Sequence, residues 1–191
     1  MGVTLVTGPV RSGKSRYVVE IAQRSGRRVS YVATAMRDGS DGEWDSRLTR
    51  HVHDRPSTWE LIESASLHPE ALAALFREGS PEQCIVVDAL GTWLAARIAT
   101  NIDALERDFA AFEVRMDAEA ADLAQVMLES QAQVVVVAEE VGWDIVPVAA
   151  SARLFRDVLG RMKQRLAAGA DAVFLVVCGF ALDLRALGST I

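Results

Sequence analysis

Five short runs of apolar, largely β-branched residues are spaced along the chain, and most of them are continuous rather than alternating. Short continuous apolar runs are typical of strands that are covered on both faces. The pattern therefore predicts a sheet with helices packed against each side. The runs span residues 3–7, 29–33, 84–88, 134–138 and 173–178.

Longer stretches between these runs repeat their apolar residues at the period of an amphipathic helix. The first ends at Arg24, just before Gly26, which suits a helix C-terminus. Strands that alternate with helices predict βαβ units, and therefore an α/β fold with a mostly parallel sheet. The length suits one domain over residues 1–191. Helices are predicted near residues 14–24, 69–76, 102–129 and 149–168.

The longest predicted helix, 102–129, carries one apolar stripe along its length. The stripe could face the sheet, or it could face a partner subunit as in a coiled-coil seam. The pattern leaves both interpretations open, and a homo-oligomer is one of them. The stripe consists of Ile102, Leu105, Phe109, Phe112 and Met116.

Composition narrows the class of partner. Half of the 191 residues are hydrophobic and the formal net charge is −6, which argues against nucleic acid or an anionic membrane as the main partner. The apolar runs are too short to span a bilayer. Cys84 and Cys178 lie in or beside predicted strands, so we interpret both as small core hydrophobes in a reducing, cytoplasmic setting.

The strongest chemical signal is a glycine-rich loop between the first strand and the first helix. Its sequence fits G-x-x-x-x-G-K-[ST], in which backbone N–H groups surround phosphates, the lysine reaches the β- and γ-phosphates and the hydroxyl ligates magnesium. The following helix adds its positive N-terminal dipole. The motif predicts a P-loop NTPase-like fold that binds a nucleoside triphosphate with Mg²⁺. It consists of Gly8, Pro9, Val10, Arg11, Ser12, Gly13, Lys14 and Ser15.

A magnesium site of this kind needs a second acid at the end of a buried strand. Asp88 ends the apolar run at 84–88 and is the favoured candidate. Glu139 and Glu140 end the run at 134–138 and are the rival candidates. An acid that only caps the next helix is the alternative interpretation of Asp88.

Two of the three histidines lie in a basic segment over residues 47–55, in a chain that is acidic overall. An imidazole beside a phosphate site could be a nucleophile, a general base or a phosphate contact. The spacing alone favours a solvated basic stretch at a helix end, and His51 with His53 is a weak metal pair. The preceding residues 37–46 are polar and contain two glycines, which predicts a flexible surface loop.

Taken in order, the motifs resemble those of the bifunctional adenosylcobinamide kinase / adenosylcobinamide-phosphate guanylyltransferase family of cobalamin biosynthesis, over nearly the whole chain. The set is far more specific than a P-loop alone. The matching segments are Thr7-Gly8-x-x-Arg11-Ser12-Gly13-Lys14-Ser15-Arg16, Tyr31-Val32-Ala33-Thr34-Ala35, Arg47-x-x-x-His51, Arg55-Pro56-x-x-Trp59-x-x-x-Glu63, Val87-Asp88, Glu140-Val141-Gly142, Ile145-Val146-Pro147, Arg153-x-Phe155-Arg156-Asp157 and Gly160-Arg161.

The resemblance implies an enzyme with two reactions. The first phosphorylates adenosylcobinamide with GTP or ATP, and the second transfers GMP from GTP to adenosylcobinamide phosphate through a GMP–histidine intermediate. His51 occupies the position of the family's nucleophilic histidine, and its basic segment suits that chemistry. The family also implies a homotrimer.

The resemblance further implies a set of residues that line the GTP site. Glu63 suits a guanine base, because a carboxylate can accept from both of its N–H edges. Asp88 and Ser15 would hold Mg²⁺, and Lys14 and Arg11 would bind the phosphates. The remaining residues of the implied site are Thr34, Ala35, Met36, Val52, His53, Asp54 and Arg55.

The sequence departs from the family pattern at three places. Asp144 stands where a second glycine is usual, and Lys163-Gln164 stands where Asn-Gln is usual. Ala89-Leu90-Gly91 replaces the usual polar residues after the acid of the 84–88 strand. None of these positions lies in the P-loop or at His51.

Two other functional classes remain open from the residues themselves. One is a P-loop small-molecule kinase in which His51 is only a phosphate contact, and the other is a non-enzymatic nucleotide switch. A bifunctional enzyme also faces a geometric problem, because a P-loop aligned for γ-phosphate transfer is not aligned for attack on the α-phosphate. Either the nucleotide binds in two poses or the segment of His51 moves.

Overall fold

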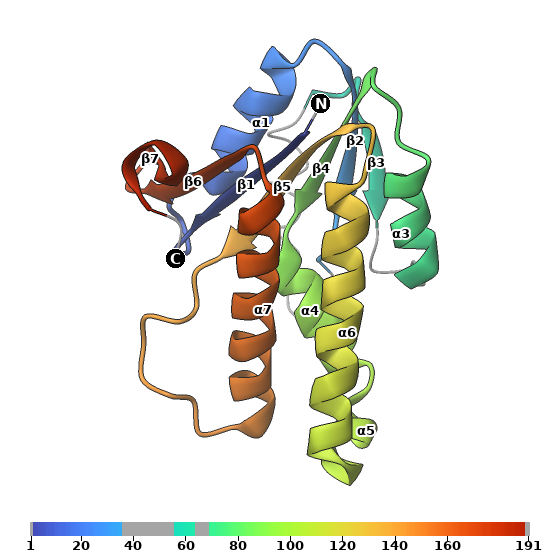
Figure 1. Ribbon diagram of the computed structural model, residues 1–191, viewed down its shortest axis with the longest axis vertical. Coiled ribbons are helices and arrows are strands. Elements are labelled where there is room, and N and C mark those ends of the chain that lie inside the picture. Colours follow the sequence, from blue (N-terminus) through green and yellow to red (C-terminus); the bar gives the residue numbers. More distant parts are fainter. Residues whose placement is uncertain (1, 36–55, 64–68, 190–191) are drawn as a thin grey trace.

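The computed structural model describes residues 2–35, 56–63 and 69–189. Within them, seven strands form one sheet in the order β3-β2-β4-β5-β1-β6-β7 (Figure 1). All neighbouring strands are parallel except β6 and β7. The strands are β1 Gly2–Gly8, β2 Arg28–Ala33, β3 Glu60–Glu63, β4 Gln83–Asp88, β5 Gln133–Glu139, β6 Ala172–Val177 and β7 Phe180–Asp183.

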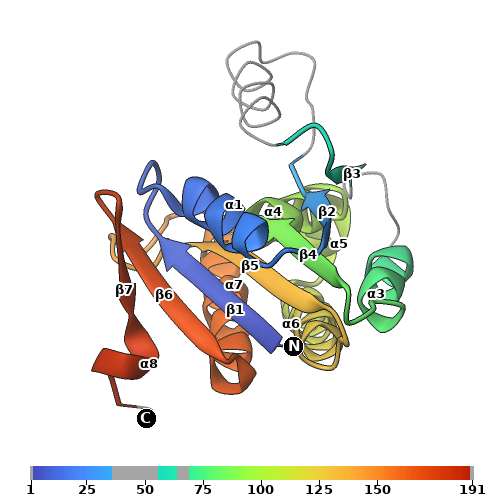
Figure 2. The same cartoon turned by 90° about the horizontal axis from the view of Figure 1, so that it is seen from above.

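Helices cover both faces of this sheet (Figure 2). Helix α1 lies on one face, and the long helices α6 and α7 lie side by side on the other. The predicted α/β fold with a mostly parallel, doubly covered sheet is therefore confirmed. The described helices are α1 Lys14–Arg24, α3 Pro69–Arg77, α4 Leu90–Ala99, α5 Ile102–Arg107, α6 Phe109–Leu128, α7 Ala150–Gly169 and α8 Leu184–Leu187.

Strand β5 shows why the apolar runs are continuous. Val134 and Val136 belong to the core beneath α6 and α7, whereas Val135 and Val137 belong to the core beneath α1. Successive side chains of a strand point to opposite faces, so a strand buried on both sides needs an apolar residue at every position. All four valines are at most 1% exposed.

The five predicted strands are present within one or two residues of their predicted ends, but the two edge strands were not predicted. Strands β3 and β7 have four residues each, and most of their side chains are exposed. A short strand at a sheet edge buries little apolar surface and leaves a weak pattern in the sequence. Helix α4 was missed as well, because it follows β4 after a single residue.

The single helix predicted over 102–129 is wrong in one respect. The chain forms α5 and α6 with a break at Asp108, whose side chain accepts a hydrogen bond from the Ala111 N–H at 3.1 Å. Aspartate is a favoured N-cap residue, so it begins a new helix at this point. The stripe faces mainly inward, since Leu105, Phe112 and Met116 belong to the core.

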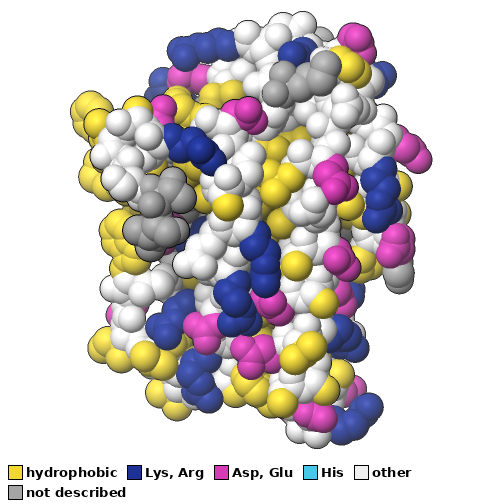
Figure 3. Space-filling model, viewed as in Figure 1, with side chains coloured by type: hydrophobic (Ala, Val, Ile, Leu, Met, Phe, Trp, Pro, Cys, Tyr) yellow, Lys and Arg dark blue, Asp and Glu magenta, His cyan; other side chains and the backbone are white. Residues whose placement is uncertain are grey.

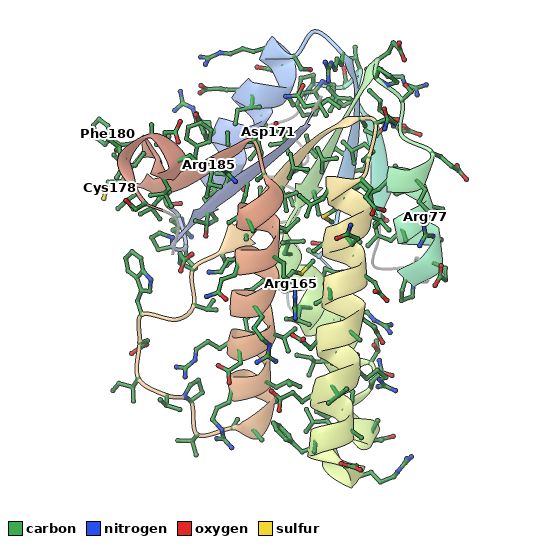
Figure 4. All side chains as sticks on the ribbon, in the orientation of Figure 1. Arg77, Arg165, Asp171, Cys178, Phe180 and Arg185 are labelled. Atoms are coloured by element: carbon green, nitrogen blue, oxygen red, sulfur yellow. The ribbon has the colours of Figure 1, made fainter. Side chains whose placement is uncertain are left out.

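The two cysteines differ from each other. Cys84 is buried as predicted, but Cys178 is exposed at the turn between β6 and β7 (Figure 4). Its position in a two-residue turn with left-handed backbone, φ 52°, keeps the side chain out of the core. Among the described helices, none combines the length and the apolar content that crossing a bilayer requires.

An ionic network joins α6 to α7 on the outer face. Asp117 of α6 accepts hydrogen bonds from Arg165, at 2.7 and 3.1 Å, and from Arg161 at 2.7 Å. Figure 4 shows Arg165 between the two helices, and basic and acidic side chains adjoin over them in Figure 3. The hydrogen bond from Arg165 is the largest of the effects that lower the pKa of Asp117, to about 2.

We expect Asp117→Asn to lower the free energy of unfolding by about 1 kcal/mol at pH 7. Water screens a carboxylate that is 26% exposed, so the effect is smaller than the shift alone would give. Because the folded pKa lies below the unfolded value of about 3.9, the contribution is present above that pH and is lost as the pH falls toward 2.

Urea unfolding at pH 7 and pH 3 measures this difference. Asp122→Asn, an exposed acid on the same helix, is the matched control and should change stability little at either pH. An equal loss for Asp117→Asn at both values would show that the ionised carboxylate contributes nothing.

Candidate active site

The P-loop connects β1 to α1 at the carboxyl edge of the sheet, as the sequence predicts. Three residues of the loop have positive φ: Gly8 at 151°, Arg11 at 56° and Gly13 at 103°. A Cβ on Gly8 would lie 2.2 Å from the backbone oxygen of Val176 in β6, so only glycine permits this approach. The loop is thus shaped by its contact with a strand from the far end of the chain.

The turn between β6 and β7 also contacts the P-loop. The Gly179 N–H donates to the Ser12 carbonyl at 2.9 Å. The Ser12 hydroxyl is buried and has no hydrogen-bond partner within the described part of the chain. Buried polar atoms are normally paired, so this hydroxyl fits a site that receives a polar ligand such as a phosphate.

Lys14 begins α1 and is only 8% exposed. Its Nζ donates to the Pro9 carbonyl of the same loop at 2.8 Å. Burial lowers the pKa of Lys14, while the nearby charges of Glu139, Asp88 and Glu140 oppose that shift. All three candidate acids therefore raise the pKa of the P-loop lysine, and Glu139 has the largest effect of the three.

Asp88 lies at the end of β4, and β5 separates that strand from β1. Its Oδ2 accepts a hydrogen bond from the hydroxyl of Tyr31, which is 1% exposed. Tyr31 stacks on Trp59 with ring centroids 6.2 Å apart. The candidate magnesium acid is therefore fixed by an aromatic pair from β2 and the segment before β3.

The two rival acids at the end of β5 have different surroundings. The Glu139 Oε2 accepts from the backbone N–H of Gly91, at the start of α4, at 2.8 Å. The Glu140 Oε1 accepts from the Thr7 hydroxyl and from Lys163 Nζ, each at 2.6 Å. Burial raises the pKa of Glu139. Glu140 is thus tied to β1 and α7, whereas the Glu139 carboxylate accepts a hydrogen bond from the N-terminus of α4.

Two departures from the family pattern contact this acid pair. Lys163 forms the ion pair with Glu140 and also donates to the backbone oxygen of Glu139 at 3.2 Å. Gly91 leaves room for Glu139, because a Cβ at this position would lie 2.4 Å from Glu139 Oε2. The sequence predicts both acids as candidate site residues but gives no role at the site to Gly91, Lys163 or Thr7. For Gly91 and Lys163, the departure from the family pattern was the available signal.

The other predicted site residues are only partly within the described structure. Thr34 is 1% exposed, and its hydroxyl donates to the Ala89 carbonyl at 2.6 Å and accepts from the Ala89 N–H at 2.7 Å. Ala35 follows Thr34 directly, and Glu63 ends the edge strand β3. His51, Met36, Val52, His53, Asp54 and Arg55 lie outside the described residues.

The donor set fits a magnesium nucleotide. Ser15, at the start of α1, supplies a hydroxyl, and Asp88 supplies a carboxylate at the same edge of the sheet. Carboxylate and hydroxyl oxygens are ligands that Mg²⁺ accepts. Among the described residues, no cluster of three or more His, Cys, Asp and Glu forms a metal cage. One hydroxyl and one carboxylate leave most coordination positions of Mg²⁺ to phosphate and water oxygens, which is how Mg²⁺ is bound in many nucleotide sites.

Comparison with known proteins agrees with this geometry. The model of the family described as cobinamide kinase / cobinamide phosphate guanyltransferase matches residues 4–184. The bifunctional adenosylcobalamin biosynthesis protein CobU of Salmonella typhimurium is 36% identical over 184 residues, which are 95% of this chain and 98% of that protein. The Escherichia coli protein of the same name is 34% identical over 184 residues, with the same coverage.

The fold of this chain is also similar to that of a protein of known structure. A prototypical ATPase from the type III secretion system of pathogenic bacteria superposes with a TM-score of 0.59 at 8% identity. The match covers 99% of this chain and 59% of that one. At this identity the likeness concerns the fold alone, which is P-loop NTPase-like, as the sequence predicts.

The contact between Gly8 and β6 makes Gly8→Ala a sharp test of the loop. The new Cβ would meet a backbone oxygen in a backbone conformation that disfavours a side chain, so the loop must shift. We expect the affinity for Mg²⁺-GTP to fall by more than about 10-fold, since the loop N–H groups no longer converge on the phosphates.

Isothermal titration with Mg²⁺-GTP measures the affinity, and circular dichroism checks that the variant is folded. The control is Gly142→Ala, where a Cβ would meet nothing within 4 Å. Unchanged GTP affinity in a folded Gly8→Ala protein would contradict the role given to this contact.

Proposed function

The chain belongs to the cobinamide kinase / cobinamide phosphate guanyltransferase family of enzymes, and from that premise we propose that it phosphorylates adenosylcobinamide and then transfers GMP from GTP to the product. The final product is adenosylcobinamide-GDP. The observation that carries the proposal is a complete P-loop, with acids at the ends of β4 and β5, inside a family match that spans residues 4–184.

In the kinase reaction the acceptor hydroxyl attacks the γ-phosphorus of GTP or ATP. A bond from the hydroxyl oxygen to phosphorus forms, the bond from the γ-phosphorus to the bridging oxygen breaks, and the nucleoside diphosphate leaves. Lys14 and the P-loop N–H groups hold the β- and γ-phosphates, and Arg11 adds charge at the loop. Mg²⁺, held by Ser15 and Asp88, would neutralise charge between the β- and γ-phosphates.

In the guanylyl reaction we assign His51 as the nucleophile. Its imidazole nitrogen attacks the α-phosphorus of GTP, pyrophosphate leaves, and a GMP–histidine phosphoramidate remains. A phosphate oxygen of adenosylcobinamide phosphate then attacks the same phosphorus and displaces the histidine. The family resemblance and the basic surroundings of His51 in the sequence support this assignment.

The GTP site proposed for this reaction combines residues from several segments. Glu63 would accept from the N1–H and N2–H₂ of guanine, at the end of β3. The other proposed contacts come from the chain that follows β2 and from the chain around His51. They are Thr34, Ala35, Met36, Val52, His53, Asp54 and Arg55.

Intact-protein mass spectrometry after incubation with GTP and Mg²⁺ tests the nucleophile. We expect the native chain to gain the mass of one GMP and to lose it in acid, because a phosphoramidate is acid-labile. His51→Ala should gain nothing, whereas the neighbouring His53→Ala should still form the adduct as the matched control.

The alternative outcomes separate the functional classes. If GTP binds and no adduct forms, His51 is a phosphate contact and the kinase interpretation alone remains. If GTP binds but cobinamide is not phosphorylated either, the chain acts as a nucleotide switch. An adduct in both histidine variants would assign the nucleophile to another residue.

We also propose a homotrimer, as the resemblance implies. Light scattering on the purified chain should give three times the mass of one 20.7 kDa chain. The stripe on α5 and α6 does not support this assembly, because most of it lies in the core. Exposed apolar side chains on the loop after β5 offer another contact surface, namely Trp143, Ile145, Val146 and Val148. A monomer at micromolar concentration would exclude the trimer.

A further inference from the structure

We infer that Glu139 receives the proton of the acceptor hydroxyl in the kinase reaction, and that Gly91 is the positioning residue that aims its carboxylate at the phosphates. The inference rests on the proposed function, since it assigns one further residue to the first of its two reactions. Neither Gly91 nor Glu139 belongs to the P-loop motif or to the GTP site proposed above.

Glu139 lies beside the P-loop. Strand β5 pairs directly with β1, and Glu139 pairs in register with Gly8, the first residue of the P-loop motif. Among the three carboxylates that act on Lys14, Glu139 has the largest effect. Because the P-loop lysine binds the β- and γ-phosphates, the pairing of Glu139 with Gly8 brings this acid to the edge of the sheet at which a group would attack the γ-phosphorus.

The hydrogen bonds of the three acids separate their roles. The Oε1 of Glu140 already accepts from Thr7 and Lys163. Asp88 accepts from the Tyr31 hydroxyl and is the proposed magnesium acid. Glu139 receives the Gly91 N–H on Oε2, and among the described residues it is Glu140, not Glu139, that forms the ion pair with Lys163. The carboxylate of Glu139 is therefore the one left to accept a proton.

Gly91 holds this geometry in two ways. Its N–H fixes Oε2 at 2.8 Å, and its missing side chain leaves the space that the carboxylate fills. A Cβ there would lie 2.4 Å from Oε2 and 2.7 Å from Cδ of Glu139. A larger residue at position 91 would displace the whole carboxylate and not merely rotate it.

In the proposed step, the acceptor oxygen forms its bond to the γ-phosphorus while its proton passes to Glu139 Oε1. The bond between the γ-phosphorus and the β–γ bridging oxygen breaks, and the electron pair leaves with the nucleoside diphosphate. Glu139 then releases the proton to water and is ready for another turnover.

Two variants test the inference with cobinamide and Mg²⁺-ATP as substrates. Glu139→Gln keeps the shape and an acceptor for Gly91 but cannot take up a proton, so kcat should fall about 100-fold. Gly91→Ala retains the acid but moves it, so kcat should fall about 10-fold. In both variants the KM for ATP and the affinity for Mg²⁺-GTP should stay within about threefold of the native values, because neither substitution replaces a residue of the P-loop.

A matched control separates displacement from a change in helix stability. Gly160 also lies within a helix, and a Cβ there would meet nothing within 4 Å. Gly160→Ala and Gly91→Ala both introduce a better helix former. Only the second should slow the kinase reaction.

The guanylyl reaction supplies the second readout. Attack on the α-phosphorus by His51 does not use Glu139, so the GMP adduct should form at the native rate in Glu139→Gln. A proportional loss of both reactions, or a rise in KM with unchanged kcat, would overturn the inference in favour of a structural or metal-binding role.

Full kinase activity in Glu139→Gln would overturn the inference and leave the proposed function intact. Full activity in Gly91→Ala would remove the positioning role. If the native chain itself does not phosphorylate cobinamide, the proposed function fails first and the inference fails with it.

Discussion

The contact between the P-loop and strand β6 is the constraint on which the site depends. The Gly8 position lies so close to the Val176 carbonyl that no side chain fits, and the Gly179 N–H binds the Ser12 carbonyl. Strand β6 begins 164 residues after Gly8, so the loop near the N-terminus takes its shape only once the C-terminal hairpin has docked. The phosphate site is therefore a property of the completed sheet and not of the motif alone.

The charges around the loop follow from the same parallel arrangement. Strands β1, β4 and β5 end at one edge, which brings Asp88, Glu139 and Glu140 to Lys14. Burying an ammonium group is costly, and the acids offset that cost, while Lys163 in turn satisfies Glu140. Among the described residues, three carboxylates lie near the P-loop lysine, so a bound triphosphate brings further negative charge close to these acids. A divalent cation allows the triphosphate to bind close to these carboxylates, because its positive charge offsets their repulsion.

A feature of the fold or of the site could be predicted from the sequence when the residues that form it are neighbours along the chain. The central strands and α1 were predictable because each is a contiguous run, and the P-loop because its eight residues are consecutive. Strands β3 and β7 leave weak patterns in the sequence. The break at Asp108 becomes evident only from the hydrogen bond with which its side chain caps α6. The pairs Gly91–Glu139 and Lys163–Glu140 join residues 48 and 23 positions apart, so only the folded chain brings them together.

The fixed geometry of the loop bears on how one site can serve two reactions. The P-loop packs against β6 at Gly8, so a loop that holds the β- and γ-phosphates in one alignment would lose contacts with them in a second pose of the nucleotide. Trp59, which follows the basic segment in the sequence, stacks on Tyr31, and the Tyr31 hydroxyl binds Asp88. A site that serves both proposed reactions must therefore bring the proposed nucleophile to the α-phosphate while Asp88 stays fixed by Tyr31 at the carboxyl edge of the sheet.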